Sequence, residues 1–140
     1  MIIPFHLING YILIDAEVNH VKGKFIFDNG TPLNFMINNN LVPLDKDSLV
    51  SKGKAGSGQL LDVYKSNIGR IKILKNYLEF QNLSNITHTN FSFMQDSIAC
   101  DILGTVGYGI MKNYIVTIDY DRQIIKMDSL HKEVLDLKKI

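Results

Sequence analysis

The stretch Phe25-Ile26-Phe27-Asp28-Asn29-Gly30-Thr31-Pro32 decides how this chain is interpreted. A run of large apolar residues delivers one carboxylate, Asp28, to a glycine turn. Burying an ionisable group at the end of an apolar strand is unfavourable unless partners satisfy it, so such an arrangement is rarely kept without a use. Asp28 is therefore the first candidate for a functional residue. The alternative is a structural turn in which Asp28 caps local backbone amides.

The composition is that of a single globular domain. The chain has 140 residues, of which 46% are hydrophobic, and a formal net charge of +1. We expect one domain over residues 1–140 that buries a core without disulfides or metals. Its scattered basic residues give no footprint for nucleic acid, and no apolar run is long enough for a membrane span. We expect no cofactor and no metal, because metal-ligand spacing is absent among His6, His20, His88 and His131.

Cys100 is the sole cysteine, so no intrachain disulfide forms, and its apolar neighbours predict a buried core position. The segment Met1–Pro4 lacks a basic region followed by a long apolar run, so no signal peptide is apparent. The compartment stays open, and a bacterial exported protein that has lost its leader is one option.

Strand signals dominate the chain and predict an all-β fold, a closed or partly closed barrel. The pair Asn9-Gly10 is a typical hairpin turn, and a second turn is expected at Gly23. Residues 78–93 are expected to mix strand and loop. The expected strands cover residues 11–18, 24–27, 33–37, 60–67, 69–74, 115–119 and 124–127.

Two segments depart from strand patterning. Residues 44–58 are polar and glycine-rich, and Gly56, Ser57 and Gly58 lie where a hairpin tip is expected between strands. An ordinary glycine-rich loop explains this segment equally well. The one short helix is expected over residues 108–114, directly after Gly107. The tail, residues 131–140, fits either a helix or an edge strand.

Taken in order, these features resemble the retropepsin-like family of aspartic peptidases. The resemblance covers residues 4–127 and rests on three elements: the apolar strand that ends in Asp28-Asn29-Gly30-Thr31, the glycine-rich hairpin, and Val106-Gly107 followed by a helix. Residues 3–15 and 111–120 are similar to single-domain bacterial members. A second glycine, in Ile102-Leu103-Gly104, competes with Gly107, which is preferred because a helix-like segment follows it.

The resemblance implies a homodimeric endopeptidase. In this family, two domains each contribute one Asp from an Asp-Thr/Ser-Gly turn, and the paired carboxylates share a proton and activate a water. This chain has one Asp-x-Gly, so Asp28 would pair only with Asp28 of a second copy. The resemblance further implies a peptide or protein substrate and a flap over about residues 50–66 that carries Gly56, Ser57 and Gly58. Residues 129–140 would form an additional C-terminal tail.

The remaining roles carried over by the resemblance fall in the loop after Asp28. Gly30 would let backbone amides turn towards the carboxylate, Thr31 would donate its hydroxyl to Asp28, and Val106-Gly107 would pack beneath the loop. Asn29 departs from the family, which has Thr or Ser there to hydrogen-bond the partner loop. An amide is longer and planar, so Asn29 favours an alternative: a catalytically impaired peptide-binding or dimerisation module. A purely structural β-domain of a larger protein is a third option.

Overall fold

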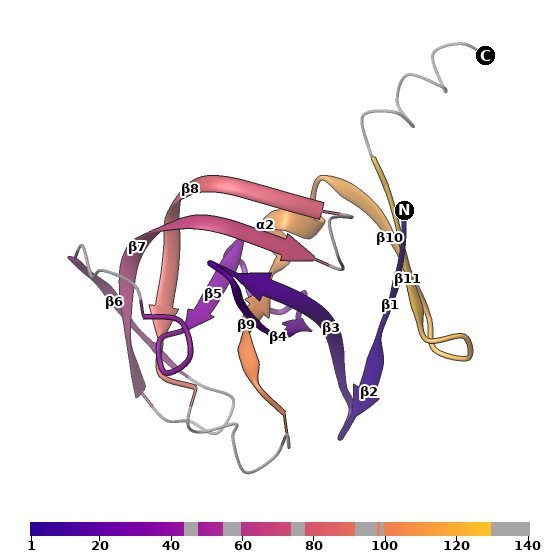
Figure 1. The fold of residues 1–140 in the computed structure, drawn as a ribbon, viewed down its shortest axis with the longest axis horizontal. Helices are drawn as coiled ribbons and strands as arrows, with labels where there is room; N and C mark the ends of the chain where they lie inside the picture. The colour runs from indigo at the N-terminus through magenta and orange to yellow at the C-terminus, as the bar shows by residue number, and fades with distance from the viewer. Residues whose placement is uncertain (44–47, 55–59, 74–77, 92–97, 99, 130–140) are drawn as a thin grey trace.

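The computed structural model describes residues 1–43, 48–54, 60–73, 78–91, 98 and 100–129, and within three of these ranges part of the chain is described by its backbone course alone. Strands dominate the described chain, with one short helix (Figure 1). The strands and helix are β1 (Ile2–Pro4), β2 (His6–Ile8), β3 (Tyr11–Val18), β4 (Val21–Phe27), β5 (Phe35–Asn38), β6 (Ser48–Lys54), β7 (Leu60–Ile73), β8 (Leu78–Thr89), β9 (Ile102–Val106), α2 (Tyr108–Met111), β10 (Tyr114–Asp119) and β11 (Ile124–Ser129).

The main sheet curls until it meets itself. Its strand order is β2-β3-β4-β9-β5-β8-β7-β6, and an additional pairing joins β3 to β7. That pairing sets Ala16 opposite Ile73 and Val18 opposite Ile71. Six strands therefore form a closed ring, visible as the curled layer in Figure 1. The expectation of an all-β, partly closed barrel with one short helix is confirmed.

Strand β9 lies between two strands that are neighbours in sequence. It runs parallel to β4, with Phe27 opposite Val106, and antiparallel to β5, with Phe35 opposite Val106. The chain leaves β4, crosses the end of β9 and returns as β5 on the other side. The segment that makes this crossing is residues 28–34, which contains the Asp28 loop.

Alternation along the strands produces two cores. In β3 and β4, Ile14, Phe25 and Phe27 point into the main cluster inside the curl, whereas Leu13 and Ile26 belong to a second cluster with Phe91, Ile98 and Ile102. Because successive side chains in a strand point to opposite faces, the second cluster covers the outer face of these strands. The last three residues of β4, which lead to Asp28, are thus apolar on both faces.

A separate sheet joins the two ends of the described chain. Its order is β1-β11-β10, with Ile3 opposite Ile125 and Val116 opposite Met127. Ile3, Ile125 and Met127 point into the main core. The opposite face carries the exposed side chains of Ile2 and Ile115.

Several local expectations were wrong. Gly23 lies inside β4, and the turn is at Asn19-His20. A Cβ on Gly23 would lie 2.8 Å from both Asp101 O and Leu103 Cγ, so no larger residue fits at this position in the strand. The close approach of the chain entering β9 therefore explains this glycine.

Further along the chain, four elements differ from the expectation. Residues 48–54 form β6 through pairing with β7, although their sequence is polar and glycine-rich. Strand β7 runs unbroken from Leu60 to Ile73, and β8 is one strand from Leu78 to Thr89. The helix stops at Met111, three residues before the expected end. The tail, residues 131–140, lies outside the described residues.

Candidate active site

Asp28 lies directly beyond the last residue of β4. Its N–H donates to Val106 O at 3.0 Å, so the ladder between β4 and β9 continues for one more step. Asp28 is half-buried, whereas Asn29 and Gly30 are exposed. The strand thus carries the carboxylate to the edge of the core and the loop turns outward after it.

Each oxygen of the Asp28 carboxylate accepts a hydrogen bond from the loop that follows. The N–H of Gly30 donates to Oδ1 at 2.9 Å, and the hydroxyl of Thr31 donates to Oδ2 at 3.2 Å. The close turn brings a Cβ position on Gly30 within 3.1 Å of Oδ1, which leaves little room for a larger residue. These two donors fix the plane of the carboxylate relative to β4.

The loop is held against the end of β9 by three backbone hydrogen bonds. The N–H of Gly107 donates to Asn34 O at 2.9 Å, Tyr108 N–H to Thr31 O at 2.7 Å, and Gly109 N–H to Leu33 O at 3.2 Å. The approach is so close that a Cβ on Gly107 would lie 2.0 Å from Leu33 O. The backbone φ of −103° is one that any residue adopts. Glycine is therefore required at this position by lack of space and not by its backbone conformation.

Two glycines in this region have different neighbours. Gly107 lies against the loop that carries Asp28, while Gly104, with φ of +152°, approaches Met36 O, 1.9 Å from a Cβ position. Val106, between them, is buried in the main core and its carbonyl accepts from Asp28. The structure therefore brings Asp28, Gly30, Thr31, Val106 and Gly107 together in one cluster.

Gly56, Ser57 and Gly58 lie outside the described residues, although β6 and β7 on either side form an antiparallel hairpin. Sequence reasoning also missed Leu33 and Asn34, whose carbonyls accept from the glycines. Every residue has a backbone carbonyl, so the identity of residues 33 and 34 does not indicate that their carbonyls accept these hydrogen bonds.

Cys100 lies at the opposite end of β9, where a small cavity of about 30 Å³ is lined by Asn38, Phe91 and Cys100, among others. Cys100 is half-buried, not fully buried as expected. Burial raises the pKa of its thiol, and the nearby Lys24 ammonium offsets part of that effect.

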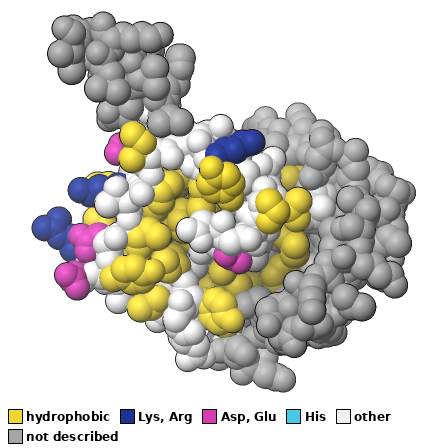
Figure 2. Space-filling view, turned by 180° about the vertical axis from the view of Figure 1, so that it is seen from behind, with side chains coloured by type: hydrophobic (Ala, Val, Ile, Leu, Met, Phe, Trp, Pro, Cys, Tyr) yellow, Lys and Arg dark blue, Asp and Glu magenta, His cyan; other side chains and the backbone are white. Residues whose placement is uncertain are grey.

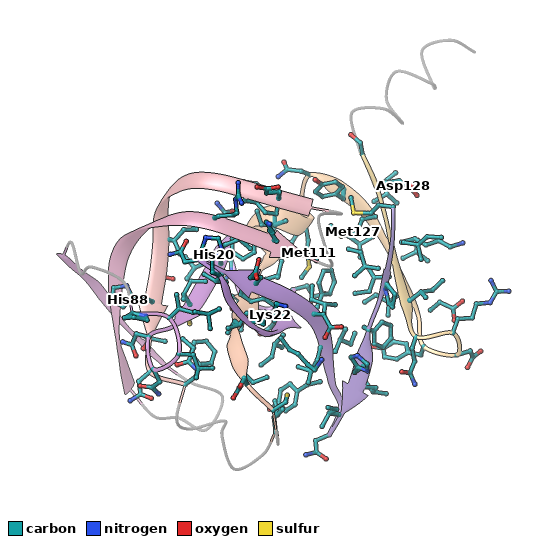
Figure 3. All side chains as sticks on the ribbon, in the orientation of Figure 1. His20, Lys22, His88, Met111, Met127 and Asp128 are labelled. Carbon is teal, nitrogen blue, oxygen red and sulfur yellow. The ribbon has the colours of Figure 1, made fainter. Side chains whose placement is uncertain are left out.

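His88 is fully buried on β8 (Figure 3). Within the described ranges, no group of three or more His, Cys, Asp or Glu side chains is arranged to hold a metal ion. The described helix is too short to cross a membrane, and no other described segment forms a longer apolar helix.

A solved structure shares this architecture. The crystal structure of a retropepsin-like aspartic protease from Rickettsia conorii superimposes with a TM-score of 0.52 at 19% sequence identity, covering 89% of this chain and 86% of that chain. This chain has a retropepsin-like fold. At such low identity, the likeness extends to the fold and not to the residues of the site. No protein-family model matches the sequence, and a search of curated proteins returned no match.

The retropepsin-like fold explains the unusual strand order around Asp28. Inserting β9 between β4 and β5 forces the connecting loop to pass over the chain at Gly107. The loop is consequently braced by the core beneath it, and its carboxylate is presented outward with both oxygens already oriented.

Proposed function

We propose that this chain is an aspartic endopeptidase that acts as a homodimer. Asp28 from each of two subunits would meet across a two-fold axis, in an isologous interface. Two carboxylates side by side hold one proton between them. The ionised member takes a proton from a water that attacks the peptide carbonyl, and the protonated member donates to the carbonyl oxygen. No covalent intermediate and no cofactor are required.

The geometry of the Asp28 carboxylate carries this proposal. A half-buried carboxylate that accepts from Gly30 N–H and the Thr31 hydroxyl is oriented before any substrate arrives. A capping Asp turn alone would account for the Gly30 contact. It would not account for a loop fastened by three hydrogen bonds to residues 107–109, far along the chain, around a glycine that no other residue can replace. Fixed geometry is what acid–base catalysis by a carboxylate pair needs.

Substrate binding under a flap is part of the same proposal. The hairpin of β6 and β7 would serve as the flap over residues 50–66, with Gly56, Ser57 and Gly58 at its tip and residues 129–140 as a separate tail of the single domain. An extended peptide would bind between flap and Asp28 as an added strand, so backbone hydrogen bonds supply much of its affinity. Closure of the flap would exclude water from the site.

The surface is compatible with a second copy as the partner. Figure 2 shows hydrophobic side chains gathered across one face of the molecule, with charged side chains concentrated toward an edge. Large hydrophobic residues with substantial exposure lie next to the site and on the terminal sheet: Ile2 at 54%, Tyr108 at 53% and Ile115 at 40%. Tyr108 begins α2, and its N–H is bonded to the Asp28 loop. Burying such residues is a source of association energy.

Cleavage of denatured casein at acidic and neutral pH tests the proposal. Asp28→Asn keeps the size of the side chain but removes its acid–base chemistry, so the rate should fall by at least about a hundredfold. The matched control is Asp101→Asn, an exposed carboxylate at the opposite end of β9, which should keep the parent rate. Cleavage that persists in Asp28→Asn would eliminate the peptidase proposal.

A peptide-binding or dimerisation module without catalysis is the second candidate, and Asn29 favours it. Asn29 is exposed beside Asp28, where a shorter hydroxyl side chain would reach the partner loop differently. Asn29→Thr should raise activity several-fold if the amide limits catalysis. A protein that sediments as a dimer but cleaves nothing, with or without Asn29→Thr, would favour the module, and a stable monomer would favour a structural β-domain.

A further inference from the structure

The ring of strands closes along a short joint between β3 and β7. Residues 16–18 of β3 pair with residues 71–73 of β7, and we call this joint the seam. It spans three residue pairs, whereas β3 pairs with β4 over six and β7 pairs with β8 over eight. Each strand is therefore held by a longer pairing on its other edge, and the seam can open without either strand leaving the sheet.

Charged side chains alternate in sign across the outer face of the seam. Glu17 is opposite Lys22 on β4 and opposite Lys72 on β7. Lys72 is in turn opposite Glu79 on β8, which forms an ion pair with Arg70 at 2.8 Å. Paired residues of neighbouring strands share a face of the sheet, so these side chains form one row over four strands. Opposite charges along the row attract each other across the joint.

One ion pair in this row crosses the seam itself. Lys72 Nζ lies 3.9 Å from Glu17 Oε2, and the two side chains are 24% and 23% exposed. Neither charge is freely solvated, and neither is out of reach of salt ions. Without the Glu17 carboxylate, Lys22 and Lys72 would face each other across β3 at about 10 Å, twice the separation of neighbouring strands. Its loss thus removes an attraction across the seam and leaves two like charges around it.

Strand β7 connects the seam to the hairpin that it forms with β6. Residues 60–65 of β7 pair with β6, and residues 71–73 of the same unbroken strand pair with β3. Opening of the seam separates β7 from β3 while the pairing with β8 remains. The β6–β7 hairpin can then shift relative to β3 as one unit.

We propose that the seam is a conformational latch on the β6–β7 hairpin, kept closed by the Glu17–Lys72 ion pair. The latch responds to ionic strength, because dissolved salt weakens the attraction between partly exposed charges. The inference is independent of the proposed peptidase activity, since the movement belongs to the fold whatever the hairpin covers.

Amide hydrogen exchange of the full chain, followed by NMR, tests the latch. The N–H of Asn19 donates to Arg70 O at 2.9 Å and continues the register of the seam by one position, so its exchange reports opening. The N–H of Asp28 is bonded to β9 and serves as the internal reference. Relative to that reference, Glu17→Gln should speed exchange at Asn19 about two- to fivefold. Unchanged exchange overturns the inference.

The matched control is Asp15→Asn. Asp15 lies on the same strand and face as Glu17 and forms an ion pair with Lys24, but it lies outside the residues that pair with β7. Breaking that ion pair should leave exchange at Asn19 as in the parent. Equal acceleration in Asp15→Asn and Glu17→Gln overturns the inference, because the effect would then be general to the strand.

The other edge of β7 shows whether the strand moves or unfolds. Both Arg70 N–H and Arg70 O face Asn19, so by alternation the N–H of Ile71 faces β8. In Glu17→Gln, exchange at Ile71 should stay at the parent's rate while exchange at Asn19 accelerates. Equal acceleration at the two positions means that β7 unfolds as a whole, which overturns the latch.

Salt and a double variant distinguish an electrostatic latch from lost packing. Raising the ionic strength from about 0.02 M to about 0.5 M should speed exchange at Asn19 about twofold in the parent and far less in Glu17→Gln. Combining Glu17→Gln with Lys72→Met should accelerate exchange by less than the product of the two single effects, because both remove the same attraction. A full salt response in Glu17→Gln, or effects that multiply, overturns the inference.

Discussion

Replacing Gly107 with alanine should strongly destabilise the molecule, because the Asp28 loop lies directly against this glycine. The new Cβ would lie 2.0 Å from Leu33 O and 2.8 Å from Thr31 O, both backbone atoms. Neither carbonyl can turn away as a flexible side chain would. The loop must therefore move off the end of β9.

The hydrogen bonds that this movement breaks set the magnitude. Three of them join the loop to Gly107, Tyr108 and Gly109. At about 1 kcal/mol each, their loss lowers the free energy of unfolding by about 3 kcal/mol, and disturbed packing brings the total to about 3–5 kcal/mol. With a urea m-value of about 2 kcal/mol/M, the unfolding midpoint falls by about 1.5–2.5 M.

Gly10→Ala is the matched control. Gly10 has φ of +82° and nothing within 4 Å of a Cβ position. Alanine there costs about 1 kcal/mol for backbone strain alone, a midpoint shift of about 0.5 M. Equal midpoints for the two variants in urea titrations followed by circular dichroism would refute the close approach of loop and strand. A Gly107→Ala chain that does not fold, while Gly10→Ala does, agrees with the reasoning.

Three further predictions concern the core and the far end of β9. Asn38→Ala removes the donor to Ile102 O at 2.8 Å and the acceptor for Asn40 N–H, so the free energy of unfolding should drop by about 2–3 kcal/mol. Asn113 is exposed and its side-chain hydrogen bonds are 3.4 Å long, so Asn113→Ala should lower the free energy of unfolding far less. Equal losses in the two variants would contradict this prediction. Phe35→Ala deletes a ring packed 5.5 Å from Phe25 and 5.3 Å from Phe80, and should destabilise by about 3–5 kcal/mol in urea unfolding. Burial raises the pKa of the Cys100 thiol, so the thiolate fraction at neutral pH is reduced. Iodoacetamide should therefore react with Cys100 more slowly than with the thiol of free glutathione, and the rate should rise as the pH is raised; equal rates for the two thiols would contradict this.

Local patterns in the sequence predict those parts of the molecule that depend on near neighbours. The apolar run that ends at Asp28, the hairpin turn at Asn9-Gly10 and the short helix after Gly107 all carry their own turn or strand chemistry. The preference for Gly107 over Gly104 as the glycine beneath the Asp28 loop is also local, because it rests on the helical segment that directly follows Gly107. Each of these features lies where its own few residues favour it.

Features that depend on distant partners could not be predicted in this way. Glycine is typical of turns, yet Gly23 is a strand residue whose missing side chain leaves room for Leu103. The polar strand β6 exists because β7 pairs with it. His88 is buried on β8, a strand that lies between β5 and β7 in the sheet.

The insertion of β9 between β4 and β5 dictates when the carboxylate acquires its working environment. Residues 21–38 are made early by the ribosome, but β4 and β5 gain the strand that both of them pair with only when residues 102–106 have been translated and inserted between them. Contacts across so much intervening chain form slowly. The Asp28 loop therefore reaches its folded geometry only after most of the chain has left the exit tunnel, and the order of the strands alone sets this delay.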